Sequence, residues 1–493
     1  MSFTPLISTP SAAPRPPSGR ADAPASNLRV AASQDDPQVY SPVRRAAFYA
    51  ALIVIFLRYS MLHEMVTYYL GGNSGVLYVF AIPALLGVAA TGGLQRSFSS
   101  RPMLYWMGFV GWLCLATPFS VWRGESARYA FSYLRTDIPM ILLFAGLVMT
   151  WKECRAALFT IAFAAMFNVA SARLFGQLFA QRVGLQFGTI GNPNDFAAHL
   201  ILVVPVLAFL VRYPMRIRMI GMLARWAGGA AMVFGSYLAI ASGSRGALMG
   251  ILAAVGFVWL KSRMPLRIAI LLGLPAAAAL LLAILPAHTI ERLQSYSTQV
   301  KAYDDEAGQS ASLRNQLLQE SIEATFTHPL FGVGPGVFGD YAGKVGSAAK
   351  WINSHNSYTQ ISSENGIPGL LFYLAGIVSP FLLIQRTWKR VRNEPELAEI
   401  ATACFCVSTG IVGFCVAILF VNFGYFFYLP AFAGLAIAMG NATDREIALR
   451  KRAPKPGPAA IKTLAPRTNP GVSVMPLAVT GAPRNRFRFG GLR

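Results

Sequence analysis

The feature that most constrains this chain is a series of apolar stretches, each long enough or nearly long enough to cross a lipid bilayer as a helix. Of the residues, 54% are hydrophobic and 13% are charged, against about 25% charged in an ordinary soluble domain. A water-soluble fold could not bury so much apolar surface. The sequence therefore predicts an all-α, polytopic membrane protein with about twelve helices, in a range of ten to twelve. The stretches lie at residues 45–62, 75–91, 103–119, 136–151, 156–173, 196–211, 226–242, 246–260, 267–287, 366–385, 400–420 and 422–440.

Polar segments divide this series into regions. Residues 1–44 are rich in Pro, Ala and Ser, and residues 441–493 are rich in Lys and Arg, so we expect two disordered tails. Residues 45–287 would hold the first nine helices and residues 366–440 the last three. The segment between them, 288–365, is the only polar region large enough to have a structure of its own.

The distribution of basic residues predicts the orientation of the chain. With the N-terminus in the cytoplasm, the inner short connections hold fifteen Lys and Arg and the outer ones hold six. This bias follows the positive-inside rule and predicts cytoplasmic termini and an outer 288–365 segment. It also accounts for much of the net charge of +22 through contact with anionic lipid. Since no recognisable nucleic-acid-binding fold accompanies the tails, we expect no nucleic-acid partner.

Within the outer segment, Leu313, Leu317 and Ile322 recur at roughly helical intervals and predict an amphipathic helix over 312–326. A turn region rich in Gly and Pro follows at 329–341.

Arginines on the predicted outer side are unexpected, because the positive-inside rule disfavours them. Arg135 and Arg245 adjoin apolar stretches, and Arg314 opens the predicted loop helix. A guanidinium binds phosphate oxygens in a planar fork, so several arginines at one surface would form a diphosphate site. The alternative is that they reach lipid headgroups or form structural ion pairs.

His355 is the second candidate, because it lies in a polar outer segment that leads into an apolar helix. A histidine titrates near neutrality and takes a proton from a hydroxyl. The alternative is that it only hydrogen-bonds within the loop. The five Cys lie in or beside apolar runs, and no P-loop, HExxH or GxSxG motif is present. We therefore predict no metal site and no cofactor.

Four segments together resemble the O-antigen ligase and polymerase superfamily in their order and spacing. They are GNPNDFAAHL at 191–200, SGSRGALMGIL at 242–252, LRNQLLQESIEATFTHPLFGVGPGVF at 313–338 and SHNSYTQISSENGIPGLLFYL at 354–374. The resemblance implies a GT-C-like glycosyltransferase fold in the bacterial inner membrane, with its active site facing the periplasm. It implies a glycan donor linked to undecaprenyl diphosphate and, as acceptor, either lipid A–core or another glycan.

The resemblance also implies roles for individual residues. Arg245 and Arg314 would bind the diphosphate, and His355 would be the base or would position the acceptor. We further predict substrate contacts at two other outer arginines, on the ground of the arginine argument above, and at five members of the matched motifs. These positions are Arg135, Arg182, Asn192, Asn194, Asn356, Tyr358 and Glu364.

Two alternatives to an O-antigen ligase stay open. A polymerase would join repeat units instead of transferring them to lipid A–core. A small-anion transporter of the bicarbonate type would show charged or broken helices near the bilayer midplane, and Arg58 is the only clear central charge. We favour the enzyme, because the polar residues concentrate in the outer segment and because arginines stabilise a lipid diphosphate leaving group without ATP or a metal.

Overall fold

The fold is built almost entirely from helices, and a helix overlaps each of the twelve predicted apolar stretches. A computed structural model of the chain describes residues 37–72, 74–179, 182–185, 187–215, 217–287, 289–290, 305–345 and 353–452. The α-helices are α2 (Pro42–Ser60), α3 (Leu62–Leu70), α4 (Val76–Ala90), α5 (Gly93–Phe98), α6 (Arg101–Ala116), α7 (Arg123–Thr136), α8 (Pro139–Leu147), α9 (Trp151–Phe175), α10 (Pro193–Arg212), α11 (Arg218–Ala241), α12 (Arg245–Lys261), α13 (Met264–Ile284), α15 (Asp305–Thr327), α16 (Phe338–Val345), α17 (Ser357–Val391), α18 (Ala398–Ala417) and α19 (Tyr428–Arg452). Short 3₁₀ helices are η1 (Pro37–Tyr40), η2 (Thr117–Phe119) and η3 (Pro395–Leu397).

The all-α prediction is confirmed except for one small hairpin. Strands β1 (Gly176–Phe179) and β2 (Arg182–Leu185) pair in antiparallel fashion, with Gly176 opposite Leu185. The hairpin connects α9 to the segment before α10. Nothing in the apolar pattern indicated it, because two strands of four residues are too short for an alternating pattern to stand out.

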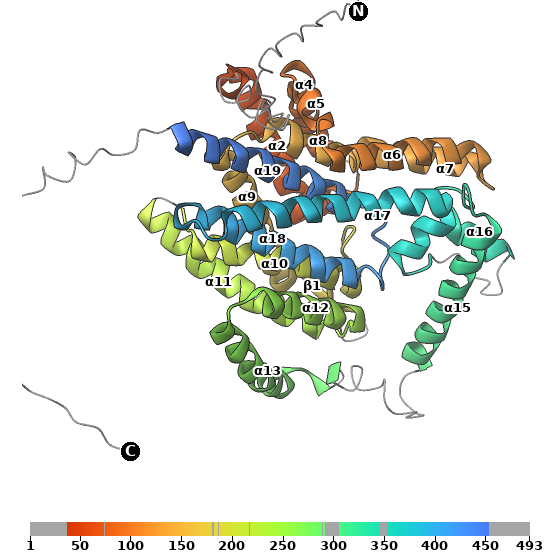
Figure 1. The fold of residues 1–493 in the computed structure, drawn as a ribbon. Helices are drawn as coiled ribbons and strands as arrows, with labels where there is room; N and C mark the ends of the chain where they lie inside the picture. The colour runs from red at the N-terminus through yellow and green to blue at the C-terminus, as the bar shows by residue number, and fades with distance from the viewer. Residues whose placement is uncertain are drawn as a thin grey trace, which may run out of the picture. The chain divides into compact units, whose positions relative to one another are not determined.

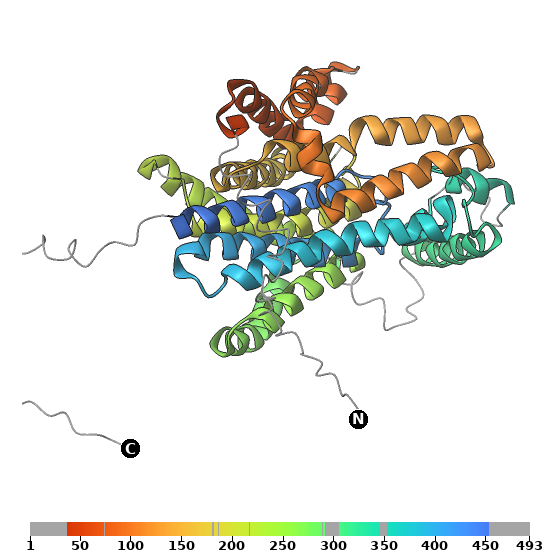
Figure 2. The ribbon, with the colours of Figure 1, turned by 45° about the horizontal axis from the view of Figure 1, so that its top comes forward.

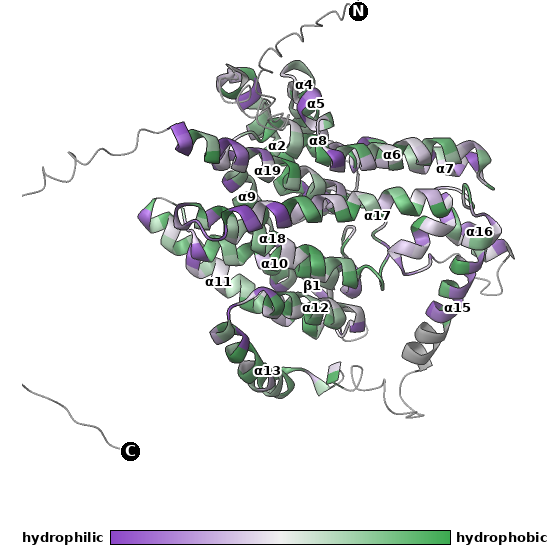
Figure 3. Ribbon diagram, viewed as in Figure 1, coloured by the Kyte–Doolittle hydropathy of each residue, from purple (hydrophilic) through white to green (hydrophobic). Residues whose placement is uncertain are grey.

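By length and composition, six helices of the described chain are able to cross a membrane, or seven if the bent pair α2 and α3 is one span. These six or seven support a multi-pass membrane protein, although they do not confirm twelve crossings. α13 makes the clearest case: it is strongly apolar, and no part of its apolar window is buried inside the protein. Figure 3 shows hydrophobic residues over most of α13. Such a surface is stable in lipid but not in water.

The central helices pack side by side around α10 and α18. α10 contacts α9, α11, α12 and α18, while α17 packs against α6 and α18 (Figures 1 and 2). α15 leaves this bundle at one end and contacts the beginning of α17. The described residues up to Ala448 form one compact unit with this arrangement.

Two predicted boundaries were wrong. Three of the six basic residues that we counted in the outer connections, Arg123, Arg128 and Arg135, lie on α7 instead, because Ser126, Ala130 and Tyr133 recur at helical spacing and form its buried face. α7 and α8 together make up one of the candidate spans. The last helix also continues through residues 441–452, which we expected to belong to a disordered tail. The rest of both predicted tails, 1–36 and 453–493, lies outside the described residues.

The predicted loop helix exists as α15 but begins earlier, at Asp305. Its buried side chains include Leu317 and Ala324, whereas Ile322 is exposed, so the apolar face differs from the predicted one. Leu317 and Ala324 join residues of the following turn and of α16 in a small separate core. The other members of that core are Val333, Val337, Phe338 and Ala342.

Helix α17 breaks at Gly366, the position where the apolar stretch was predicted to begin. The backbone there has φ 69° and ψ −175°, which lies outside the helical region and is open only to glycine. A Cβ atom at Gly366 would come within 2.1 Å of the Leu330 carbonyl oxygen. The break therefore lets residues 329–338 pack directly against the backbone of α17.

Candidate functional site

A cavity of about 430 Å³ brings together four of the residues that the sequence singled out: Arg245, Arg314, His355 and Asn356. They come from three places in the chain, the first turn of α12, the middle of α15 and the segment before α17. The other lining residues are Gly246, Asn315, Leu318, Ser354, Leu419 and Phe420. The two arginines and the histidine thus share one cavity, while their catalytic roles remain predictions.

Arg245 is held at the start of α12 by a tight turn of small residues. Gly243 adopts a positive φ of 61°, and the Ser244 hydroxyl accepts a hydrogen bond from the Ala247 amide at 3.3 Å. A Cβ atom at Gly246 would lie 2.5 Å from Cβ of Phe420. The small residues of the SGSRG segment therefore let α12 begin against the 419–420 segment, and Arg245 is half-buried where the two meet.

Arg314 is placed by the small core of the loop. Leu317 is buried on the inner side of α15, and Arg314 lies nearly one turn before it, half-buried. α15 is fixed to α17 by a 2.8 Å hydrogen bond between the hydroxyls of Thr325 and Ser362. These contacts fix α15, the helix of the outer segment, so that Arg314 lies at the cavity.

His355 lies at a strained point of the chain, with a φ of 52°. The next residue, Asn356, caps α17: its side-chain oxygen accepts the amides of Tyr358 and Thr359 at 2.9 and 3.2 Å. Ser357 then bonds to the 418–423 segment through three hydrogen bonds of 2.7–2.9 Å. These contacts fix the backbone on the C-terminal side of His355, so the place of His355 at the cavity is set by the fold.

Burial, together with the nearby positive charge of Arg314, lowers the pKa of His355 to about 4. The ring is therefore neutral at pH 7, with a nitrogen lone pair available to accept a proton. A bound anion near Arg314 would offset that charge and raise the pKa of His355 again.

Three predicted residues do not line the cavity but connect the elements beside it. They are Arg182, Asn192 and Asn194. Arg182, on β2, donates to the Ser242 carbonyl at 2.5 Å and to the Asn194 side chain at 2.6 Å. It thereby links the turn before Arg245 to the start of α10. Asn192 is the N-cap of α10 and accepts the Asn194 amide at 2.8 Å.

The side chains of two predicted substrate contacts form hydrogen bonds within the protein instead. Glu364 is fully buried, and its carboxylate accepts the amides of Gly336 and Phe338 at 2.9 and 3.3 Å. The Tyr358 hydroxyl donates to the Cys415 carbonyl at 2.9 Å, between α17 and α18. In this structure Glu364 fixes the 329–338 turn and Tyr358 holds two helices together.

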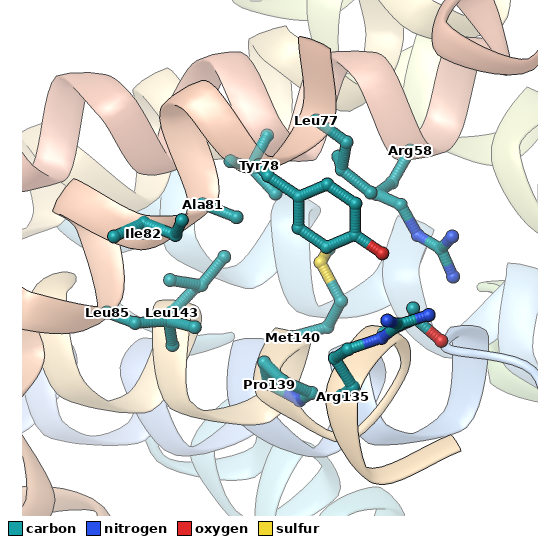
Figure 4. Close-up of a pocket in the computed structure, with 12 residues that line it drawn as sticks. Arg58, Leu77, Tyr78, Ala81, Ile82, Leu85, Arg135, Pro139, Met140 and Leu143 are labelled. Carbon is teal, nitrogen blue, oxygen red and sulfur yellow. The ribbon is translucent and has the colours of Figure 1, made fainter. Parts of the chain in front are cut away.

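Arg135 lines a different cavity, between α2, α4, α7 and α8 (Figure 4). The expectation that it joins the other arginines is wrong, because α7 directs it toward Arg58 and Tyr78.

Several cavity residues were not predicted from the sequence. Asn315 and Ser354 adjoin Arg314 and His355 within the quoted motifs and could have been included on that ground. Leu419 and Phe420 carry no sequence signal, since only tertiary packing brings them to the cavity. Asp195 was also missed: it does not line the cavity, but it lies close enough to Arg314 for the two charges to interact.

The arrangement suits chemistry on an anionic group beside a hydroxyl. Two guanidinium groups supply positive charge and directional donors for phosphate oxygens, and a neutral histidine beside them accepts a proton. Among the described residues, no cluster of three or more His, Cys, Asp and Glu side chains is arranged to hold a metal ion. Metal independence stays a prediction.

Residues 230–374, less than half of the chain, match the family model described as O-antigen ligase. No curated protein matches the chain in a sequence search. The matched segment begins within α11, ends within α17 and includes Arg245, Arg314 and His355. The family so described implies glycosyltransferase-type activity in a broad sense and glycan and lipid substrates at the membrane. Because the match covers the arginines and the histidine of the cavity, it supports membership of this chain in the O-antigen ligase family.

Proposed function

We propose that the cavity between α12, α15 and the start of α17 transfers a glycan from undecaprenyl diphosphate to an acceptor hydroxyl. The observation that carries this proposal is the convergence of Arg245, Arg314 and a neutral His355 on one cavity of about 430 Å³. The acceptor that we favour is lipid A–core, as in an O-antigen ligase. The cavity would then face the periplasm of the bacterial inner membrane, as the basic-residue bias predicts.

In the proposed step, the acceptor hydroxyl oxygen attacks the anomeric carbon of the donor sugar. The bond between that carbon and the diphosphate oxygen breaks, and the hydroxyl proton passes to the imidazole of His355. The diphosphate leaves with its negative charge stabilised by Arg245 and Arg314. Before this step, the bound diphosphate offsets the charge of Arg314 and raises the pKa of His355, so the base strengthens when the donor is present.

The direct test is a transfer assay with purified protein, undecaprenyl-diphosphate-linked glycan and lipid A–core. A glycan–lipid A–core product is expected from the wild type, and its loss in both Arg245→Gln and Arg314→Gln variants that remain folded would support the assignment. Full activity in either variant would show that the corresponding arginine does not bind the leaving group.

A deletion strain separates ligase from polymerase. Loss of a ligase leaves lipid-linked polymer that is never attached to lipid A–core. Loss of a polymerase leaves single repeat units on the lipid carrier. Accumulated single units would replace the ligase assignment by the polymerase one, without changing the roles proposed for the cavity residues.

Two observations also fit a small-anion transporter. Helices α2 and α3 meet at a 70° bend, and Arg58 forms an ion pair with Asp137 inside the helical bundle at 2.5 Å. Broken helices and charged residues inside the helical bundle are expected of a transporter. The test is bicarbonate uptake by proteoliposomes that contain the purified protein. Uptake that is lost in Arg58→Gln, together with no glycan transfer by the wild type, would favour this alternative.

A further inference from the structure

A second cavity, of about 270 Å³, lies between α2, α4, α7 and α8 and shares no lining residue with the proposed active site. Figure 4 shows that its two ends differ in chemistry. The guanidinium groups of Arg58 and Arg135 and the hydroxyl of Tyr78 converge at one end. Apolar side chains line the other end, namely Ala81, Ile82, Leu85 and Leu143.

Arg58 is nine-tenths buried and only partly satisfied. Its guanidinium pairs with Asp137 at 2.5 Å and lies over the Phe427 ring at 4.3 Å, but its Nε has no hydrogen-bond partner within the described part of the chain. A buried donor without a partner is costly, and a guanidinium N–H is satisfied well by an anionic oxygen. The unsatisfied Nε of Arg58 therefore indicates that the cavity binds a ligand that supplies a hydrogen-bond acceptor.

Arg135 adds a second positive charge at the same end. It is exposed, and its guanidinium lies 5.6 Å from the centres of both the Tyr78 and Phe131 rings. Within the described ranges it forms no ion pair, and no acidic side chain lines the cavity. Since Asp137 neutralises only Arg58, the polar end keeps a net positive charge.

The apolar end determines what kind of anion fits. A free phosphate would use only the arginine end and would leave the apolar surface of α4 and α8 uncovered. At about 270 Å³ the cavity is smaller than a typical drug-sized site, so it holds a segment of one hydrocarbon chain and not a whole lipid. α7 and α8 together form a candidate membrane span, so lipid chains would have direct access to this position.

We propose that this cavity binds one phosphate-bearing membrane lipid, with its phosphate between Arg58 and Arg135 and part of one acyl chain against α4 and α8. The Tyr78 hydroxyl donates to the same phosphate. The site is separate from the proposed transfer reaction and does not depend on it.

The test measures binding to the purified, delipidated full chain in detergent by native mass spectrometry. The probes are phosphatidylglycerol, diacylglycerol with the same acyl chains, and inorganic phosphate. We expect phosphatidylglycerol to bind at least about tenfold more tightly than either of the others, because only it offers both a charged headgroup and a chain. Equal retention of diacylglycerol would overturn the proposal, since the arginines would then contribute nothing.

Variants separate the two ends of the cavity. Arg135→Gln should weaken phosphatidylglycerol binding by about tenfold, while Arg123→Gln, at the other end of α7, should leave it unchanged. Ala81→Phe fills the apolar end and should abolish lipid binding, but not any weak phosphate binding. If Arg135→Gln binds like the wild type, Arg135 is a membrane-surface anchor. If inorganic phosphate binds as tightly as the lipid and Ala81→Phe has no effect, the cavity is a site for free phosphate.

Discussion

The two arginines of the proposed active site offer a planar fork of donors that lysine cannot reproduce. Arg245→Lys keeps the positive charge but makes a point contact with one phosphate oxygen. Losing one charge-assisted hydrogen bond of about 1.5–3 kcal/mol should lower kcat/KM for transfer about ten- to a hundredfold. Arg123→Lys, on α7 and outside the cavity, is the matched control and should transfer normally. A near-wild-type rate in Arg245→Lys would mean that only charge matters at this position.

Replacement of His355 must respect its backbone, because its φ of 52° is tolerated by Asn and Gly but strained for Ala. His355→Asn keeps the fold and removes the base, so we expect kcat to fall about 10²–10⁴-fold with little change in unfolding temperature. The control is His328→Asn, whose ring packs against Tyr341 away from the cavity. An active, stable His355→Asn protein would exclude His355 as the base.

The lowered pKa of His355 predicts a characteristic pH dependence. The ring must be neutral to accept a proton, so activity falls as pH falls through its pKa. For the free enzyme that pKa is about 4, so the acid limb of kcat/KM should lie near pH 4. The acid limb of kcat should lie at higher pH, since the bound diphosphate offsets Arg314. Two limbs that coincide near pH 6.5 would show that His355 is not buried beside Arg314 during catalysis.

At the scale of elements, the break in α17 is what lets the loop reach the site. The amides of Val333 and Gly334 donate to the carbonyls of Ser363 and Glu364 at 2.8 and 3.1 Å, and Ile367 donates to Pro329 at 2.8 Å. These bonds exist only because α17 is open at Gly366. The 329–338 turn and the break are therefore one structural unit, which holds in place helix α15 with Arg314.

Gly366→Ala should disrupt this unit. The added Cβ would meet the Leu330 carbonyl oxygen at 2.1 Å in a backbone conformation that alanine avoids, so we expect a loss of at least about 1–3 kcal/mol in unfolding free energy. Gly273→Ala in α13 is the opposite control: a Cβ atom at Gly273 would have no atom within 4 Å, and a helical alanine should stabilise slightly. The measurement is the thermal unfolding temperature of each purified variant, compared with that of the wild type. Equal unfolding temperatures would mean that the break is not required.

Sequence reasoning succeeded for elements with a strong local signal and failed where the structure depends on distant packing. Long apolar runs predicted stretches that helices overlap, and the motifs and outer arginines singled out Arg245, Arg314 and His355, which share a cavity. Sequence reasoning grouped Arg135 with Arg245 and Arg314. The structure separates them, because the buried face of α7 sets the direction in which Arg135 projects. Sequence reasoning also took Glu364 for a substrate contact, because a carboxylate that binds backbone amides looks the same in sequence as one that binds sugar.

At the scale of the whole molecule, α17 fixes which residues lie on opposite sides of the membrane. Its segment from 367 to 391 has twenty-five residues and rises about 37 Å, enough to cross a hydrocarbon core of about 30 Å. His355 of the cavity and Lys344 precede this segment, and the exposed residue Asn393 follows it. Whatever the orientation, Lys344 and Asn393 should therefore face different compartments.

The basic-residue bias then predicts which compartment is which, and single cysteines test the prediction. The exposed Cys114 and the half-buried Cys415 are first replaced by Ala, since the remaining three Cys are buried. In that background, Lys344→Cys should react with a membrane-impermeant thiol reagent added to cells with a permeabilised outer membrane. Asn393→Cys should react only after the inner membrane is lysed. The reverse pattern would place the cavity in the cytoplasm and remove lipid A–core as the acceptor. Labelling of both sites from outside would show that α17 does not cross the membrane.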